Sequence, residues 1–322
     1  MKVLKNELLK QHTSFRVGGP AKVYVVPESI EELEKLIHFL YEEKLPYDII
    51  GNGTNLLVSD AGVDHVVVEI GRALEEITLL PSSHASGEAS SLRACGPAGI
   101  RKEGCASSEA SDENVVKLHA SAGTLLSRVA RFAAAQELSG MEALGGIPGT
   151  IGGAVTMNAG AYGTEMKDVL REVEVLTREG ERRMLSVEEL GLGYRQSIIP
   201  EKGYIVVAAT LALKKGDPAE IEARMADYQQ RRRDKQPLDK ASAGSTFKRP
   251  EGYFAGKLIE DTGLRGFRHG GAQVSEKHCG FIVNDGTARA EDIYWLIGEV
   301  RKRVLLEQHV ELTPEVKLWG EF

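Results

Sequence analysis

The chain has 322 residues, of which 42% are hydrophobic and 27% are charged. Typical domains have roughly 150 residues, so this length predicts about two domains, and the composition excludes a disordered or fibrous chain. The 40 basic and 47 acidic residues leave a net charge of −7. This excludes a broad nucleic-acid-binding surface, which needs a basic face. An anionic ligand must therefore be held by local cations or by backbone amides.

No stretch of the sequence has the pattern of a targeting or membrane-spanning segment. Residues 1–15 lack the apolar run of about 7–15 residues that a signal peptide requires, and no later segment has the ~20 apolar residues of a membrane helix. The cysteines Cys95, Cys105 and Cys279 form no CxxC pair, so neither a disulfide framework nor a metal site is predicted. We expect a cytoplasmic protein with reduced thiols. Whether Cys95 and Cys105 pair is left open.

The N-terminal part alternates between strand and helix patterns. The elements expected there are a strand over 21–26, a helix with its apolar residues from Ile30 to Leu40 on one face, a strand running into GNGTN at 51–55, and a strand over 63–70. Ser29 and Glu32 predict a capping box at the start of the helix. Residues 77–114 then have few large apolar side chains and are rich in serine. Such a segment cannot bury enough surface to offset its ordering entropy, so it is predicted to be a mobile surface insertion.

The pattern of alternating elements resumes at residue 115. The elements expected are a strand over 115–120, a helix over 124–138 that stops at Gly140, a glycine-dense stretch over 145–163, a hairpin over 169–185 that turns at Glu179 and Gly180, and a strand over 204–213. Asp217, Pro218 and Glu220 then mark the start of a new helix. This break divides the chain into predicted domains of residues 1–214 and 215–322. Helices over 254–262 and 291–307, with strands over 280–283 and 315–319, predict a compact α+β C-terminal domain.

The glycines Gly51 and Gly53 directly follow a predicted strand. A dinucleotide-binding fingerprint would need a third glycine at position 56 and a helix opening there, but position 56 is Leu56 and the following residues have a loop and strand pattern. Two interpretations remain, a simple turn or a loop whose amides bind a phosphate together with Thr54 and Asn55.

The stretch from Gly145 to Gly163 is unlike a flexible linker, which would be polar. Seven of its nineteen residues are glycine, and the residues between them include Ile147, Pro148, Ile151 and Val155. It is either a tight bend between strands or a segment whose backbone approaches a large flat or phosphorylated ligand closely. Two such loops favour a nucleotide cofactor held without a Rossmann helix.

Seven motifs occur in order along nearly the whole chain outside residues 77–114. They are HTSFRVGGPA at 12–21, GNGTN at 51–55, IPGTIGGAVTMNAGAYG at 147–163, GYRQS at 193–197, AGSTFKRP at 243–250, GGAQVSEKH at 270–278 and TPEVKLWG at 313–320. Together they resemble the UDP-N-acetylenolpyruvoylglucosamine reductase (MurB) family, in its type II form.

This resemblance implies an α+β fold with non-covalently bound FAD. The expected fold is an FAD-binding module of the vanillyl-alcohol-oxidase (PCMH) type made of two α+β lobes, followed by a C-terminal α+β substrate-binding domain. Backbone amides of two loops would hold the FAD pyrophosphate. The cofactor-binding residues expected are Gly51, Asn52, Gly53, Thr54, Asn55, Ile147, Pro148, Gly149, Thr150, Gly152, Gly153 and Asn158.

The resemblance also implies a reaction, the NADPH-dependent reduction of UDP-N-acetylenolpyruvoylglucosamine to UDP-N-acetylmuramate for peptidoglycan. Arg195 matches the active-site arginine, and its planar cation suits a carboxylate. Ser245 matches the serine that protonates C2 of the substrate, although the sequence alone would make it a loop or cap serine. Glu315 matches the active-site glutamate, which could be partly buried for acid–base or polarising work. The cysteine-poor, acidic chain is expected to act on small molecules, without nucleic acid or membrane. Its oligomeric state is left open, with a monomer favoured.

Five further residues are expected in the substrate site. They are Tyr194, Lys235, Lys257, Gln273 and His278, of which Lys235 and Lys257 are candidates for the substrate diphosphate. The run from Arg231 to Arg233 is left out, because arginines at a helix end more often form a solvated face that compensates the helix dipole. Arg249 stands where many relatives have asparagine, so the substrate contact of that asparagine is in doubt.

Two other functions remain open at this stage. One is an FAD-dependent oxidase or dehydrogenase of the same fold that acts on a hydroxy acid or sugar. Such an enzyme would not require the motifs around Ser245 and Glu315 together. The other is a flavin- or nucleotide-sugar-binding protein without catalysis, against which the presence of Arg195, Ser245 and Glu315 argues.

Overall fold

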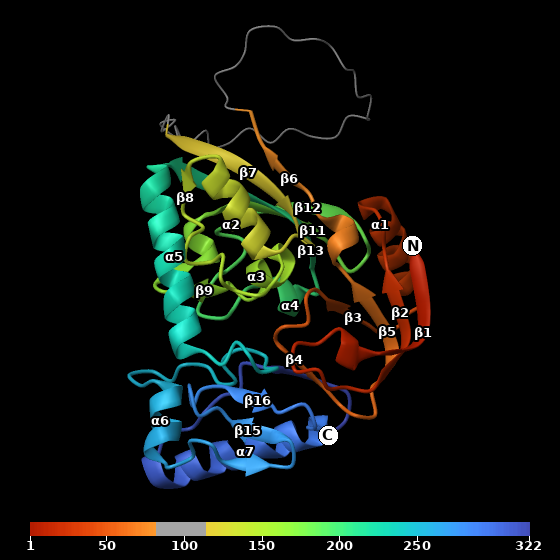
Figure 1. Ribbon diagram of the computed structural model, residues 1–322. Helices are drawn as coiled ribbons and strands as arrows, with labels where there is room; N and C mark the ends of the chain where they lie inside the picture. Colours follow the sequence, from red (N-terminus) through yellow and green to blue (C-terminus); the bar gives the residue numbers. More distant parts are fainter. Residues whose placement is uncertain (82–113) are drawn as a thin grey trace, which may run out of the picture.

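The computed structural model describes residues 1–81 and 114–322. Within these residues the chain forms two α+β lobes and, below them in Figure 1, a smaller C-terminal α+β region. The predicted α+β fold is thus confirmed. Most of the predicted insertion, including Cys95 and Cys105, lies outside the described residues, while Cys279 is a buried free thiol.

The first lobe contains a four-stranded sheet and one helix. The strands, in their order across the sheet, are β1 (Lys2–Leu8), β2 (Pro20–Val26), β5 (Val63–Glu69) and β3 (Tyr47–Ile50). The helix α1 (Ile30–Glu42) begins after Ser29, whose hydroxyl accepts the Glu32 N–H at 3.2 Å. The other half of the predicted capping box differs, because the Glu32 carboxylate accepts the N–H of Glu28 at 2.9 Å instead of that of Ser29.

The second lobe is built on a sheet around one long apolar strand, β13 (Ile205–Lys215). Its other strands are β12 (Arg182–Ser186), β11 (Leu170–Leu176), β7 (Val115–Ser121), β6 (Ile77–Leu79) and the short β8 (Leu138–Ser139). β6 pairs with β7 in an antiparallel register, so the predicted start of the insertion at residue 77 is wrong. The hairpin predicted around Gly180 is present, and Gly180 has a φ of 85°.

Two other predicted elements of this lobe differ from the structure. The helix α2 (Leu126–Ala135) ends before Gly140, because Glu137 takes a left-handed conformation with a φ of 58° and β8 follows at once. The glycine-dense stretch is not all loop, since it contains the short helix α3 (Ile151–Thr156) capped by Thr150. The remaining elements of this part are β9 (Gly160–Ala161), β10 (Thr164–Glu165), α4 (Ile199–Lys202) and the 3-10 helices Leu9–Gln11, Arg72–Leu74 and Met166–Asp168.

A shared hydrophobic core joins the two lobes. The apolar face of α1, including Leu33 and Ile37, belongs to the same buried cluster as Leu118, Val173 and Leu211 of the second sheet. A smaller cluster lies around Tyr24 in the first lobe. Because the lobes share a core, the loops that each contributes to the space between them are held at fixed positions.

The C-terminal region follows a long helix, α5 (Pro218–Lys235), which begins at the predicted cap Asp217. It consists of α6 (Ala255–Asp261), β14 (Arg268–His269), β15 (Ala272–Val274), β16 (Ile282–Asn284) and α7 (Ala290–Gln308). The last strand, β17 (Lys317–Trp319), leaves this region and pairs in parallel with β4 (Leu56–Val58). A boundary between residues 214 and 215 remains a prediction.

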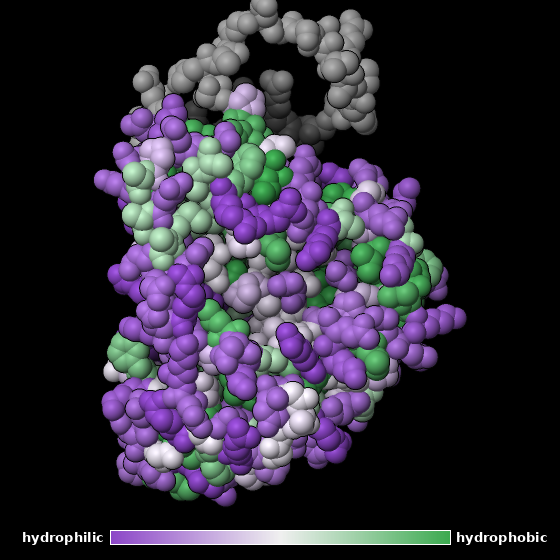
Figure 2. Space-filling model, in the orientation of Figure 1, coloured by the Kyte–Doolittle hydropathy of each residue, from purple (hydrophilic) through white to green (hydrophobic). Residues whose placement is uncertain are grey.

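The outer surface is mainly polar. Figure 2 shows the face seen in Figure 1 covered mostly by hydrophilic residues, with smaller apolar patches between them. No helix within residues 1–81 and 114–322 combines the length and apolar character needed to cross a membrane.

Asp60 connects the N-terminal lobe to the C-terminal region by capping α7. Its carboxylate accepts the N–H groups of Ala290 at 3.1 Å and Glu291 at 3.2 Å. Because loss of such a cap costs about 1 kcal/mol, we expect Asp60→Ala to lower the free energy of unfolding in urea by about that amount. The matched control is Asp64→Ala, since the Asp64 side chain is 98% exposed. Equal stability of the two variants would contradict this role.

Candidate active site

A large cavity lies where both lobes meet the C-terminal region. Its volume is about 1480 Å³, and its lining includes residues 51–56, 147–150, Arg195, 242–245, 277–281 and Glu315. Single drug-sized ligands occupy pockets of roughly 300–1,000 Å³. This cavity therefore has room for more than one ligand.

The first glycine loop, residues 51–55, connects β3 to β4 at the cavity wall. Gly53 has a φ of +58°, and a Cβ there would lie 1.8 Å from the carbonyl oxygen of His12. Glycine is thus required for both backbone conformation and space. Within the described residues, the N–H groups of 51–55 donate no hydrogen bond to the protein. They remain available to an anionic ligand, as the phosphate-binding interpretation requires.

The second glycine loop meets the first. The side-chain amide of Asn52 donates to the carbonyl oxygen of Pro148 at 2.8 Å, and a Cβ on Gly51 would lie 2.6 Å from the hydroxyl of Thr150. Gly149 is open, because the nearest atom to its hypothetical Cβ is the Thr54 hydroxyl at 3.9 Å. The two loops thus form a narrow backbone cradle, which fits the pyrophosphate of a dinucleotide such as FAD.

Part of the second loop cannot bind phosphate in the expected way. The N–H groups of Ile151 and Gly152 donate to the carbonyl oxygens of Thr124 at 2.8 Å and Ala122 at 2.9 Å, and that of Gly153 donates to the Thr150 hydroxyl at 3.4 Å. The expected contribution of these amides is therefore wrong, because they cap and anchor α3. The amides of Gly149 and Thr150 have no such acceptor in the described part of the chain.

Asn158, another expected cofactor residue, does not line the cavity. It is fully buried, donates to the carboxylate of Glu165 at 3.1 Å and the carbonyl of Gly193 at 2.9 Å, and accepts the N–H of Lys167 at 3.0 Å. All its side-chain groups are thus used to join Glu165 and Lys167 to Gly193, the first residue of the GYRQS motif. Its role is structural, and it positions Arg195 indirectly.

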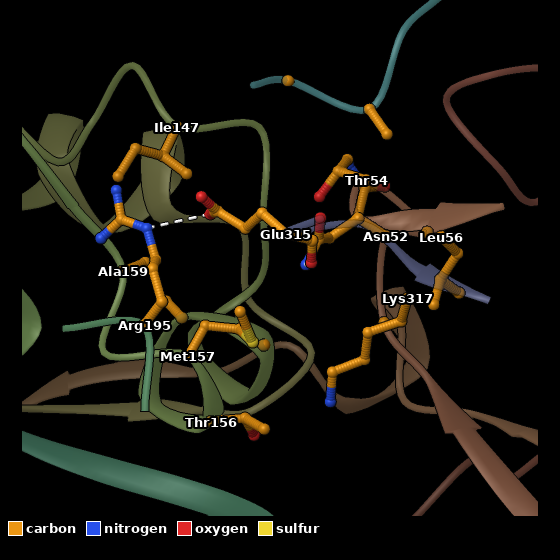
Figure 3. A pocket seen from close by; sticks show the side chains of 18 of the residues that line it. Asn52, Thr54, Leu56, Ile147, Thr156, Met157, Ala159, Arg195, Glu315 and Lys317 are labelled. Carbon is orange, nitrogen blue, oxygen red and sulfur yellow. Dashed lines mark hydrogen bonds and ion pairs between the residues drawn. The ribbon is translucent and has the colours of Figure 1, made fainter. Parts of the chain in front are cut away.

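Arg195 and Glu315 form an ion pair at the cavity wall (Figure 3). The Arg195 Nε–H donates to Glu315 Oε1 at 2.9 Å, and its Nη2 donates to the carbonyl oxygen of Gly160 at 3.0 Å. Arg195 has a φ of 53°, and its side chain is 19% exposed against 16% for that of Glu315. These contacts fix one side of the guanidinium and leave the rest of the fork available to a ligand carboxylate.

Burial shifts the titration of Glu315, a member of this pair, and of Lys317. It raises the pKa of the Glu315 carboxyl above its ordinary value, and Arg195 opposes this shift without cancelling it. It also lowers the pKa of the Lys317 ammonium, which lines the same cavity but points away from the Arg195–Glu315 contact in Figure 3. Both groups are moved towards their neutral forms, which is typical of groups that exchange protons during catalysis.

Ser245 is brought next to Glu315 by backbone pairing. The Glu315 N–H donates to the carbonyl oxygen of Thr246 at 2.8 Å, and the Thr246 N–H donates to that of Gly280 at 2.8 Å. Ser245 is exposed on the cavity wall, and its hydroxyl has no hydrogen-bond partner among the described residues. The three expected catalytic residues therefore share one cavity.

Four of the five expected substrate residues line this cavity, namely Tyr194, Lys235, Lys257 and His278. Lys257 already pairs with Asp261 at 2.5 Å. Burial lowers the pKa of His278, whose Nδ1 accepts the N–H of Gly280 at 3.1 Å. This favours a neutral ring with its proton on Nε2.

Gln273 departs from the expectation and does not line the cavity. It lies on β15, where its side chain is buried and bonded to Arg268 at 2.9 Å and Glu276 at 3.2 Å. These contacts satisfy the amide within the C-terminal region. Gln273 lies on the middle strand of its sheet, and this position keeps its side chain away from the cavity.

The cavity is cationic although the chain is acidic. Ten of its lining residues are lysine or arginine, and three are acidic (Asp48, Glu260 and Glu315). Arg249 is among the cations, with its guanidinium 3.9 Å from the ring centre of Phe254. Arg232, which the sequence analysis left out, also lines the cavity. Arg232 lies three residues before Lys235 on the same helix, and this spacing predicts that both side chains lie on the same face.

The comparisons with known proteins agree with this geometry. The FAD binding domain family matches residues 21–85 and 107–186. The chain is 48% identical to UDP-N-acetylenolpyruvoylglucosamine reductase of Agathobacter rectalis over 320 residues, 99% of this chain and 95% of that protein. It is also 48% identical to the enzyme of that name from Caldanaerobacter subterraneus, over 99% of this chain and 94% of that protein.

The chain belongs to the UDP-N-acetylenolpyruvoylglucosamine reductase family. The C-terminal domain of this family matches residues 236–319. The crystal structure of the MurB enzyme from Thermus caldophilus is 36% identical in sequence, covers 99% of this chain and 98% of its own, and superposes with a TM-score of 0.75. The fold expected from the resemblance, a two-lobed FAD-binding module with a C-terminal domain, is confirmed.

Gly53→Ala tests the cradle. A methyl group there meets the His12 carbonyl, whereas at Gly191, whose φ is +54°, it meets nothing within 4 Å. Gly191→Ala therefore reports the left-handed strain alone, about 1–2 kcal/mol. We expect Gly53→Ala to destabilise the protein by more than this control and to reduce its FAD content, measured from the flavin-to-protein absorbance ratio. A Gly53→Ala variant with full FAD content would contradict the proposed close approach.

Glu315→Gln tests the raised pKa. Between the ordinary glutamate pKa of 4.5 and the raised pKa, Glu315 is protonated in the native protein more often than in the unfolded chain. The stability that Glu315 contributes is therefore present at low pH and is lost as the pH rises. The free energy of unfolding of Glu315→Gln relative to wild type should therefore increase from acid to neutral pH. A decrease with pH would mean that Arg195 outweighs burial.

Proposed function

We propose that this chain uses NADPH and bound FAD to reduce UDP-N-acetylenolpyruvoylglucosamine to UDP-N-acetylmuramate. The observation that carries the proposal is the convergence of Arg195, Ser245 and Glu315 on a cavity that also contains the glycine cradle. Membership of the reductase family at 48% identity over the whole chain supports it. The volume of about 1480 Å³ is consistent with a cofactor and a second nucleotide bound together.

The residues that would hold FAD are those of the cradle, through the backbone amides of 51–55, Gly149 and Thr150. FAD, when bound, supplies the hydride-transfer chemistry that connects NADPH to the substrate. The protein groups bind, orient and stabilise charge. Asn52 supports this arrangement by joining the two loops through Pro148.

The substrate reaction dictates what the side chains must do. Reduction of the enolpyruvyl group adds hydride at C3 and a proton at C2, so negative charge develops at C2 and the adjoining carboxylate. Arg195 keeps its charge at any working pH and offers free guanidinium N–H groups to that carboxylate. Glu315 holds the guanidinium in place through the 2.9 Å contact to Nε.

The proton for C2 is assigned to Ser245. Its hydroxyl is exposed to the cavity and is not committed to another described residue. A hydroxyl is a weak acid, so it donates effectively only to a strongly basic centre with cations nearby. The cationic lining supplies that field and stabilises the alkoxide that remains. Glu315, biased towards its neutral form by burial, is placed to assist proton movement.

The function is tested with purified protein. We expect a flavin absorption spectrum, and NADPH oxidation that depends on the enolpyruvyl substrate and forms one UDP-N-acetylmuramate per NADPH. Product is measured by mass spectrometry. Protein that binds no flavin after addition of FAD, or NADPH oxidation indifferent to the substrate, would refute the proposal.

Ser245→Ala separates the two halves of the reaction. NADPH should still bleach the flavin absorption at the wild-type rate, while product formation falls by at least about a hundredfold, the usual range for loss of a general acid. Stopped-flow absorbance measures the first step and substrate-dependent turnover the second. Ser242→Ala, at a serine on the same cavity wall, should leave both unchanged. Surviving turnover in Ser245→Ala would show that another group donates the proton.

A further inference from the structure

The motif HTSFRVGGPA at 12–21 supports the first glycine loop from outside the cavity. None of its residues lines the cavity. The Ser14 N–H donates to the carbonyl oxygen of Gly53 at 3.0 Å, and the His12 carbonyl lies so close to Gly53 that no Cβ fits there. A shift of the His12 backbone would therefore displace the loop whose amides face the cofactor.

The His12 side chain joins three strands of the first lobe. Its Nε2 lies 3.0 Å from Glu7 Oε1 on β1, and its Nδ1 lies 2.9 Å from the Tyr24 hydroxyl on β2. That hydroxyl donates to Glu69 Oε2 on β5 at 2.6 Å. Tyr24 is fully buried, and the other three side chains are at most 25% exposed. These four residues form the His12 cluster.

The contacts of the His12 cluster require a charged ring. Tyr24 has one hydroxyl proton, which it donates to Glu69, so its oxygen can only accept a bond from His12 Nδ1–H. The Glu7 carboxylate also only accepts, so the contact at Nε2 needs a second ring proton. Burial and the bond to Glu69 raise the pKa of Tyr24 above its ordinary value, so Tyr24 keeps its own proton. Only the doubly protonated imidazolium satisfies both contacts at once.

Loss of one ring proton would break this arrangement. The titratable groups that contact His12 are Glu7, Tyr24 and Glu69, so two carboxylates stabilise a single positive charge. A neutral ring would turn a lone pair towards either Glu7 or the Tyr24 oxygen, and a charge-assisted hydrogen bond would be lost. Because the carbonyl beneath Gly53 belongs to the same residue, the change would reach the cradle directly.

We infer that His12 is a positioning residue for FAD, held as an imidazolium between Glu7 and Glu69, and that loss of its proton weakens cofactor binding. No member of the His12 cluster lines the cavity, so the cluster acts through the loop at Gly53 and not by touching the cofactor. This inference deepens the FAD-binding part of the proposed function and does not depend on the substrate assigned there.

Glu7→Gln tests this inference without removing the ring. The new amide can donate to an unprotonated Nε2, so the cluster no longer needs the extra proton. The dissociation constant of FAD is measured by ultrafiltration of diluted holoenzyme between about pH 6 and about pH 9, the range in which histidines titrate. Wild type should lose at least about tenfold in affinity towards the alkaline end, as expected for one hydrogen bond to a charged group.

Glu7→Gln should bind FAD as wild type does at the acid end and should not show the alkaline loss. The matched control is Glu307→Gln, at an exposed glutamate whose side chain has no partner among the described residues. This control should keep the pH dependence of wild type. Any loss of affinity that comes from other titrating groups would appear in all three proteins, so the difference between wild type and Glu7→Gln isolates the His12 cluster.

Nitrogen NMR of histidine-labelled holoenzyme reports the ring directly. His12 should show two protonated ring nitrogens at neutral pH, and its signal is identified by its absence in His12→Asn. This variant should also weaken FAD by about tenfold or more at both ends of the pH range. The control His309→Asn, at an exposed histidine, should bind FAD as wild type does.

The inference is overturned if the His12 ring is neutral at neutral pH, if wild type and Glu7→Gln lose FAD affinity alike as the pH rises, or if His12→Asn binds FAD as tightly as wild type. Should His12→Asn fail to fold, the Glu7→Gln comparison still decides. None of these measurements uses NADPH or the enolpyruvyl substrate, so failure of this inference and failure of the proposed function are distinguishable.

Discussion

The parallel pairing of β17 with β4 is the constraint on which the site depends. At the start of this pairing, the Lys317 N–H donates to the carbonyl oxygen of Asn55 at 3.0 Å. The side-chain amide of Asn55 in turn donates to the carbonyl oxygen of Glu315 at 3.1 Å. The first glycine loop and Glu315 are thus held by the same backbone ladder. A change that loosened this short strand would displace both the cofactor cradle and the partner of Arg195.

The charge distribution follows a simple division between the outside and the cavity. Arginines on the surface are mostly paired with carboxylates, as in Arg224 with Glu142 at 2.8 Å. Inside the cavity, cations outnumber acids and some have no protein partner within the described residues. An acidic protein can therefore bind several polyanionic ligands in one place, because the ligands themselves supply the missing counter-charges.

Sequence reasoning identified the glycine loops and the three catalytic candidates, but could not give the contacts that decide their roles. Arg195 and Glu315 are far apart in the chain, and only the return of β17 brings them together. The glycine spacing predicts a ligand-binding loop at Gly152 and Gly153, whereas the amides of both residues are used within and beside α3. The sequence does not show which side of α5 faces Gly146, so it does not distinguish Arg232 from Arg231 and Arg233.

The distances along the chain between contacting residues also have a kinetic consequence. Arg195 and Glu315 are separated by 120 positions, and Asn55 and Glu315 by 260. Contacts between such distant residues form late in folding, because the loop-closure entropy must be overcome before they contribute stability. The two lobes can collapse around their shared core first, and the site is completed afterwards by the last strand. The rate at which refolding protein gains the ability to bind flavin would then report the final step of folding. This rate would differ from the rate at which secondary structure forms.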